Sequence, residues 1–269
     1  MATKTYDELC FTDDFMFCKV LENDPELCRE LIEIILGVKI EIVEKVGKQT
    51  PIEITPDGRG VRLDVRLEGD GRIFNLEMQN AKKKELPRRS RYYQGLIDLD
   101  QLERGSKYSE LKETFIIFLC TFDPFGQGLA RYTVKSMIEE APGIEYNDGT
   151  HKIYLSSLPD QEGSMSEGLR RFLNYMNDYS AEDDFTRRLE TAVARAKSME
   201  SWRKEYMFLY EHEEEARAEG LEEGRAEGAR DALLSLVRDG LITAEAAAER
   251  MDITEEEVQA LLEEAKAEA

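Results

Sequence analysis

Hydrophobic and polar residues alternate strictly in residues 61–68 and again in residues 74–79. Every second residue is apolar, and most of the residues between them are charged or carry an amide. A period of two predicts two β-strands, each with one buried face. Asp70-Gly71 separates the two halves and favours a type I′ turn, which needs positive φ at both positions. The pattern therefore predicts a β-hairpin.

The predicted turn also fixes how the two strands pair. With residues 70 and 71 as the loop, apolar residues face one another: Leu63 with Met78, Val65 with Leu76 and Leu67 with Phe74. On the other face Asp64 lies opposite Glu77, and Arg62 opposite Gln79. A slip by one residue would oppose apolar and polar side chains throughout, so we exclude it. A four-residue loop would keep the faces but set Asp64 against Asn75.

Asp64 and Glu77 are the candidate site residues of this hairpin. Opposed residues on one face have Cβ atoms about 4.5–5.5 Å apart, so their two carboxylates repel unless a cation lies between them. Oxygen ligands of this kind suit a hard cation such as Mg²⁺. The alternative is a solvated, charged sheet face on which Arg62 and Arg66 neutralise the carboxylates without a metal. The alternation alone leaves both interpretations open.

The rest of the chain predicts an α/β or α+β fold. A continuous apolar run at residues 115–120 is typical of a central strand buried on both faces. A helix over residues 86–104 has Leu96, Leu99 and Leu102 as its apolar positions. Further helices are predicted at 12–23, 25–36, 164–177 and 183–199, and further strands at 38–46, 51–54, 131–138 and 151–155, with a turn at 55–58.

The net charge of −21 is unevenly distributed along the chain. From Glu205 onward there are 20 acidic and 6 basic residues, so the tail carries most of the acidity. A basic cluster directly follows Gln79 and is followed by two tyrosines; it comprises Lys82, Lys83, Lys84, Arg88, Arg89 and Arg91. It is either a solvated face or a contact surface for phosphate.

Several functional classes are excluded by composition. Four cysteines without C-x-x-C spacing indicate reduced thiols and a cytoplasmic protein. Two histidines are too few and too isolated for a zinc site or a Ser/His/Asp triad. We find no secretory signal and no apolar run near the ~20 residues that a membrane span needs, so we expect no membrane partner.

Asp64 followed by Glu77-x-Gln79 on the next strand resembles the signature of the PD-(D/E)XK nuclease superfamily, with glutamine in place of the usual lysine. The segments at residues 12–19, 75–79, 91–94 and 105–111 resemble the Rpn family of recombination-promoting nucleases, also known as transposases of the PD-(D/E)XK type. The resemblance implies a restriction-endonuclease-like core, a mixed sheet flanked by helices, over residues 1–160.

The resemblance also implies a function, which is Mg²⁺-dependent endonucleolytic hydrolysis of DNA in recombination or mobile-element biology, with Mn²⁺ as a possible substitute. Asp64 and Glu77 would hold the metal, Gln79 would orient water, and Asp14 would complete the site. The expected DNA contacts are Lys82, Lys83, Arg88, Arg91 and Tyr92. Because glutamine supplies no positive charge, Arg62 or Lys82 would have to provide it. The alternatives are a catalytically weak or inactive DNA-binding or oligomeric interaction protein on a nuclease fold, and an adaptor that does not bind nucleic acid.

After the core we predict a helical extension over residues 161–210 that packs on it through Trp202, Tyr206, Phe208 and Leu209. An acidic helical tail over residues 211–269 carries Gly220, Gly224 and Gly228. Each glycine costs about 1 kcal/mol within a helix, which suggests either close helix approach in a homo-oligomer or a loose linker. The last two predicted helices have helix-turn-helix spacing. The second is acidic, which favours a packing module over DNA recognition.

Overall fold

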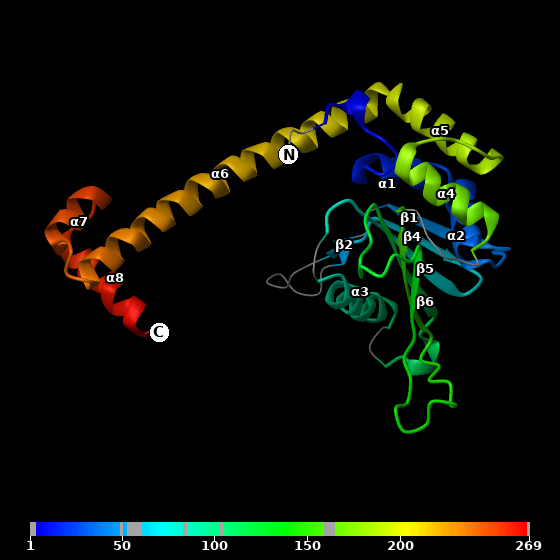
Figure 1. The fold of residues 1–269 in the computed structure, drawn as a ribbon, viewed down its shortest axis with the longest axis horizontal. Helices are drawn as coiled ribbons and strands as arrows, with labels where there is room; N and C mark the ends of the chain where they lie inside the picture. Colours follow the sequence, from blue (N-terminus) through cyan, green and yellow to red (C-terminus); the bar gives the residue numbers. More distant parts are fainter. Residues whose placement is uncertain are drawn as a thin grey trace. The chain divides into compact units, whose positions relative to one another are not determined.

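The structure is a computed structural model that describes residues 4–48, 51–52, 61–82, 85–102, 105–158 and 165–267. The chain forms two compact units, one up to Arg203 and the other from Lys204 onward (Figure 1). The first contains a β-sheet with helices, and the second is helical. The boundaries at residues 160 and 210 stay predictions. No helix in the described part of the chain has the length and apolarity needed to cross a membrane.

The main sheet of the first unit has six strands in the order β1-β4-β5-β6-β8-β7. Its central strands β5, β6 and β8 are parallel, and the other neighbours are antiparallel, so the sheet is mixed as predicted. The strands are β1 (Val43–Lys48), β4 (Val65–Gly69), β5 (Arg72–Gln79), β6 (Glu113–Cys120), β7 (Arg131–Val134) and β8 (Thr150–Ser156). A two-stranded sheet pairs β2 (Pro51–Ile52) with β3 (Val61–Arg62).

The predicted hairpin turn and register are confirmed. Asp70 and Gly71 have φ values of 50° and 70°, as a type I′ turn requires. Strands β4 and β5 pair Gly69 with Arg72, Leu67 with Phe74 and Val65 with Leu76. A four-residue loop is therefore wrong.

The hairpin ends earlier than predicted, because β4 begins only at Val65. Asp64 does not pair with Glu77 in the ladder, and Arg62 pairs with Pro51 rather than with Gln79. Side chains replace the ladder hydrogen bonds at this point. The Asp64 amide donates to Oε1 of Glu77 at 3.2 Å, and the Met78 amide donates to Oδ2 of Asp64 at 2.9 Å. The strand bends at Asp64, and Asp64 still contacts Glu77 through its backbone amide.

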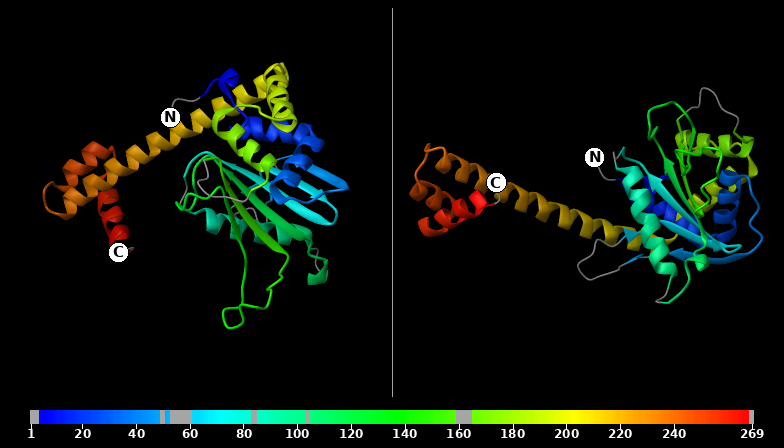
Figure 2. Two further views of the ribbon diagram at one scale, coloured as in Figure 1. Left: turned by 45° about the vertical axis from the view of Figure 1, so that its right-hand side comes forward. Right: turned by 90° about the horizontal axis from the view of Figure 1, so that it is seen from below.

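Helices cover both faces of the sheet (Figure 2). One face carries α1 (Asp14–Asn23) and α2 (Pro25–Leu36), against which α4 (Glu167–Asp178) and α5 (Asp184–Lys197) pack; the other carries α3 (Leu86–Gln101). Short 3₁₀ helices lie at Tyr6–Glu8 and Tyr108–Glu110. The predicted ends of α2 are confirmed. Asp24 accepts a hydrogen bond from the Leu27 amide at 3.0 Å, and Gly37 ends the helix at φ 69°.

Two element predictions were wrong in detail. Strand β1 begins at Val43 instead of residue 38, because the amides of Glu41 and Ile42 donate to the Asp70 carboxylate at 3.0 and 2.8 Å. Leu99, predicted on the apolar side of α3, is 62% exposed. The buried face of α3 instead comprises Leu86, Ser90, Tyr93, Gln94, Leu96 and Ile97. The predicted turn at 55–58 lies outside the described residues.

In the second unit, α6 (Glu200–Arg238), which starts in the first unit, runs unbroken through Gly220, Gly224 and Gly228. Its last turns form a small core with α7 (Ala244–Met251) and α8 (Glu255–Ala267) around Leu234, Ala247, Ala248 and Val258. Tyr206, Phe208 and Leu209 belong to this second unit, so their predicted packing against the core stays a prediction.

Candidate active site

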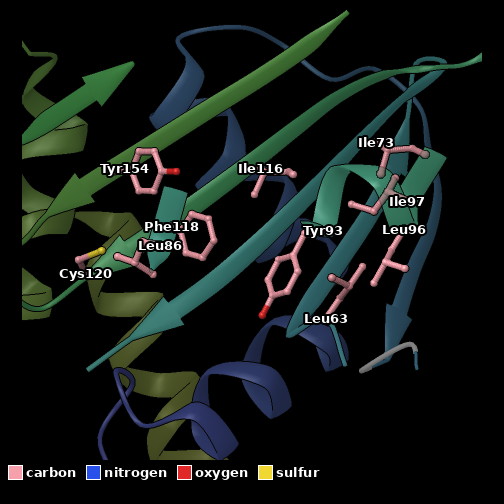
Figure 3. Packing of buried hydrophobic residues seen from close by; sticks show 10 residues of the cluster. All are labelled: Leu63, Ile73, Leu86, Tyr93, Leu96, Ile97, Ile116, Phe118, Cys120 and Tyr154. Atoms are coloured by element: carbon pink, nitrogen blue, oxygen red, sulfur yellow. The ribbon is translucent and has the colours of Figure 1, made fainter. Parts of the chain in front are cut away.

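The polar face of β5 is buried, so the interpretation as a solvated sheet face is wrong. Asn75, Glu77 and Gln79 are 0%, 1% and 7% exposed, because α3 covers the face from which they project. Figure 3 shows the apolar side chains that pack between α3 and this face. Burying polar groups is costly unless they are hydrogen-bonded, and burying a carboxylate costs more. A charged residue kept in such a position points to a function beyond folding.

Glu77 lies beside Asp64, and each has hydrogen-bond partners on the neighbouring strand. Oε1 of Glu77 accepts hydrogen bonds from the Asp64 amide at 3.2 Å and from Nδ2 of Asn75 at 3.0 Å. Burial and, after it, the neighbouring Asp64 charge raise the pKa of Glu77 to about 8, against the opposing effect of the Asn75 hydrogen bond. Near neutral pH this carboxylate therefore needs either a proton or a cation.

Arg89 reaches the pair from α3. Its Nη1 donates to Oε1 of Gln79 at 2.6 Å, and its Nη2 lies 3.8 Å from Oε2 of Glu77. Nε and Nη2 also donate to the Tyr93 hydroxyl at 3.2 and 2.6 Å. The guanidinium carbon lies 5.3 Å and 5.9 Å from the ring centroids of Tyr93 and Phe118. A cation is thus fixed beside Gln79.

Arg89 stood in the predicted basic cluster, but the sequence interpretation did not assign it to the site. A signal was present, because Arg89 follows Leu86 by three residues and precedes Tyr93 by four. Side chains at these spacings share one side of a helix. Arg89 therefore interrupts the buried stripe of α3 with a charge, which marks it as a candidate for the site.

The two arginines that the sequence suggested as partners of Asp64 and Glu77 behave differently from Arg89. Arg66 is buried and pairs with Asp100 at 2.6 Å and with Glu68 at 3.1 Å, so its predicted role beside Asp64 and Glu77 is wrong. Arg62 belongs to β3, and its side chain lies outside the described residues. Lys82 is exposed just past β5.

The predicted DNA-contacting residues lie on and near the outer side of α3. Arg88, Arg91 and Tyr92 are exposed, and their spacing of three and four residues places them on one side of the helix. Lys82 precedes this helix and is also exposed, whereas Lys83 lies outside the described residues. Helix α3 therefore presents an exposed basic side while its other side covers the carboxylates.

Asp14 is exposed at the first position of α1. The segment just before this helix reaches the end of β5, where the carbonyl of Thr12 accepts a hydrogen bond from Nδ2 of Asn80 at 2.5 Å. Asn80 follows Gln79 directly. The opening segment and the predicted signature thus meet at one end of β5, although they are far apart in the sequence.

The donor set fits a magnesium-like ion better than a zinc site. Among the residues that the structure describes, no group of three or more His, Cys, Asp and Glu side chains is arranged to hold a metal. Mg²⁺ is usually bound by one or two carboxylates, with water and substrate phosphate completing its shell. Asp64 and Glu77 provide such a pair, and their mutual repulsion favours a cation between them.

Comparison with protein families places this chain in a known family. Residues 12–232 match the model of the PD-(D/E)XK nuclease family transposases, and the chain belongs to this family. The match confirms the predicted fold class and the resemblance to PD-(D/E)XK transposases, whereas the narrower likeness to the Rpn proteins stays a prediction. PD-(D/E)XK nucleases generally use divalent metals, and a nuclease family implies DNA as substrate. No curated protein and no solved structure matches the chain.

Proposed function

We propose that the protein is a Mg²⁺-dependent DNA endonuclease that hydrolyses phosphodiester bonds in recombination or in the movement of mobile elements. Mn²⁺ would substitute for Mg²⁺. The observation that carries this proposal is the Glu77 carboxylate, which is buried beneath α3 beside Asp64. A folding role alone gives no reason to keep two interacting carboxylates there, whereas a divalent cation and a phosphate substrate do.

In this proposal Asp64 and Glu77 hold the metal. A bound Mg²⁺ polarises a phosphoryl oxygen and lowers the pKa of a water molecule. The Met78 amide fixes the Asp64 carboxylate, and Asn75 fixes Glu77 through Oε1. Such partners orient metal ligands and are nearly as important as the ligands. Gln79 orients the attacking water through its amide, and Asp14 completes the acidic set from the start of α1.

The DNA backbone would lie along the exposed basic side of α3. Arg88 and Arg91 neutralise phosphates, Tyr92 adds a hydrogen bond or a stacking surface, and Lys82 lies exposed just past β5. Lys83, its neighbour in the sequence, adds a further positive charge. Phosphate contacts of this kind make affinity fall steeply with salt. The total charge of −21 does not oppose this placement, because 20 of the acidic residues follow from Glu205 onward.

We also propose that the protein forms homo-oligomers through its C-terminal helices and acts in the cytoplasm. Gly220, Gly224 and Gly228 lie four residues apart in an unbroken helix, with nothing within 4 Å of the Cβ position of each. A second helix could approach closely along this side. Light scattering should give an oligomer for the wild type and a smaller mass for Gly224→Leu. The four cysteines are free, which supports a reducing compartment.

The test of the nuclease is nicking of supercoiled plasmid with Mg²⁺ or Mn²⁺. Wild type is compared with Glu77→Gln, with an EDTA control, and with Glu110→Gln, which changes an exposed glutamate outside the site. We expect nicking by the wild type and by Glu110→Gln only, and none with EDTA. Equal nicking by Glu77→Gln would remove the catalytic assignment. Salt-dependent DNA binding without nicking by the wild type would support the inactive DNA-binding alternative.

A further inference from the structure

We propose that Arg89 is the positioning residue that supplies, from α3, the positive charge that Gln79 does not provide. This inference rests on the proposed nuclease function and assigns a role to a residue outside the Asp64 and Glu77-x-Gln79 signature. In that signature a lysine side chain would carry the charge on β5 itself. Here the charge comes from the neighbouring helix and meets Gln79 through a 2.6 Å hydrogen bond.

The hydrogen bond to Arg89 determines which way the Gln79 amide points. A guanidinium has donors and no acceptor, so the atom that it contacts must be the amide oxygen. The amino group of Gln79 then faces the Met78 carbonyl, to which it donates at 2.5 Å. Arg89 and the Met78 carbonyl together hold the amide in this orientation. Since a phosphate and its attacking water need a defined donor, Arg89 controls the chemistry that Gln79 offers.

Arg89 is also held firmly enough to act as a fixed charge. The Tyr93 hydroxyl accepts two of its N–H groups, at 3.2 and 2.6 Å. The planar group lies over the rings of Tyr93 and Phe118, an arrangement that favours a cation. Arginine stays protonated at every pH of interest. A charge that is positioned before the reaction stabilises negative charge as it develops on phosphate.

A purely structural role is the competing explanation. In it Arg89, 3.8 Å from Oε2 of Glu77, only offsets a buried carboxylate. The two explanations differ in what a relocated charge can do. If Arg89 serves the reaction, a lysine at position 79 should replace its effect on rate. If Arg89 only stabilises the fold, its loss should lower Tm, and the rate of the folded fraction should not change.

The experiment measures nicking rates and Tm for Arg89→Gln, Arg89→Lys and the double variant Gln79→Lys/Arg89→Gln. Arg170→Gln, an exposed arginine on α4, is the matched control. Arg89→Gln should slow nicking about 10²-fold, the loss typical of one electrostatic stabiliser. Arg89→Lys keeps a positive charge but loses the planar group that bonds both Gln79 and Tyr93, so its rate should lie between those of wild type and Arg89→Gln. The double variant should recover at least about tenfold over Arg89→Gln, and Arg170→Gln should match wild type.

Nicking by Arg89→Gln at the wild-type rate, or no recovery in the double variant, would overturn the inference. If Arg89→Gln does not fold, Tyr93→Phe decides, because it keeps the ring and removes the hydroxyl that holds Arg89. We expect Tyr93→Phe to slow nicking with little change in Tm, and a wild-type rate would count against Arg89.

A wild type that does not nick refutes the nuclease itself. Mn²⁺ calorimetry on Arg89→Gln then tests the placement of the Arg89 charge: loss of a cation beside Glu77 should tighten Mn²⁺ binding, and unchanged affinity would overturn that placement and with it the inference.

Discussion

The protein keeps carboxylates in two opposite settings. Glu77 is 1% exposed beneath α3, next to Asp64, whereas the glutamates along the middle of α6, such as Glu222 and Glu227, are exposed. Exposed charges are solvated and screened by salt. A buried carboxylate loses its hydration, and a second carboxylate beside it adds repulsion. The net charge of this protein is therefore a poor guide to its chemistry. A better guide is a charged residue that is kept in a buried position although its burial costs stability.

The largest difference between the two settings should appear in activity. We expect Glu77→Gln and Asp64→Asn to reduce plasmid nicking by more than the roughly 10–100-fold that loss of a metal ligand's hydrogen-bond partner causes. Glu222→Gln on α6 removes the same charge from an exposed position and should leave the rate unchanged. Comparable losses in Glu222→Gln and Glu77→Gln would mean that burial does not distinguish the two sets of carboxylates.

Divalent metal should stabilise the protein through the buried pair alone. With Mg²⁺ at 100 times its Kd, the free energy of unfolding should rise by about 2.7 kcal/mol. Denaturant titration with and without Mg²⁺ measures the gain. It should vanish in Asp64→Asn and persist in Glu222→Gln. Stabilisation that survives Asp64→Asn would place the bound ion elsewhere.

Stability without metal should depend on pH through Glu77. Its pKa is raised from 4.5 to about 8 in the folded protein, so the folded state holds a proton that the unfolded state has released. The contribution of this bound proton to the free energy of unfolding is fully present below about pH 4.5, and it is lost as pH rises to about 8. The slope approaches about 1 kcal/mol per pH unit in that interval. Denaturant titrations in EDTA at several pH values should show this slope in wild type and not in Glu77→Gln. A parallel pH profile for the two would contradict the raised pKa.

The smallest effect is expected for a carboxylate with a purely structural role. Asp24 is exposed and caps α2 through the Leu27 amide at 3.0 Å. Asp24→Ala should lower the free energy of unfolding by about 1 kcal/mol and leave nicking of the folded protein unchanged. Thermal unfolding and the nicking assay together check this. A loss of activity larger than the loss of folded protein would show that Asp24 does more than cap the helix.

The elements that the sequence predicted well are those with local determinants. Asp70-Gly71 sets the turn, and the turn sets the register of β4 and β5 without reference to the rest of the fold. Asp24 and Gly37 likewise mark the two ends of α2. The carboxylate pair followed from this register. Asp64 does contact Glu77, but through its backbone amide, because the strand bends at Asp64 and the two residues are not opposed in the ladder.

The remaining features depend on groups that are distant in the sequence. Nothing in the alternating pattern indicates that Asp64 will take the Met78 amide and interrupt the ladder. The polar face of β5 looks like a solvated face until α3 is known to cover it. The same packing turns Arg89 inward and leaves Leu99 exposed. Alternation identifies which residues share a face but not which element covers that face.

Anomalous diffraction from crystals grown with Mn²⁺ would locate the bound ion directly. We predict an anomalous peak bound by the carboxylates of Asp64 and Glu77 beneath α3, and no peak there in crystals of Glu77→Gln. Peaks confined to the exposed glutamates of α6, with the Asp64 and Glu77 carboxylates free of metal, would contradict it. In that case the buried pair would be a feature of the fold, and the catalytic centre would have to be sought elsewhere.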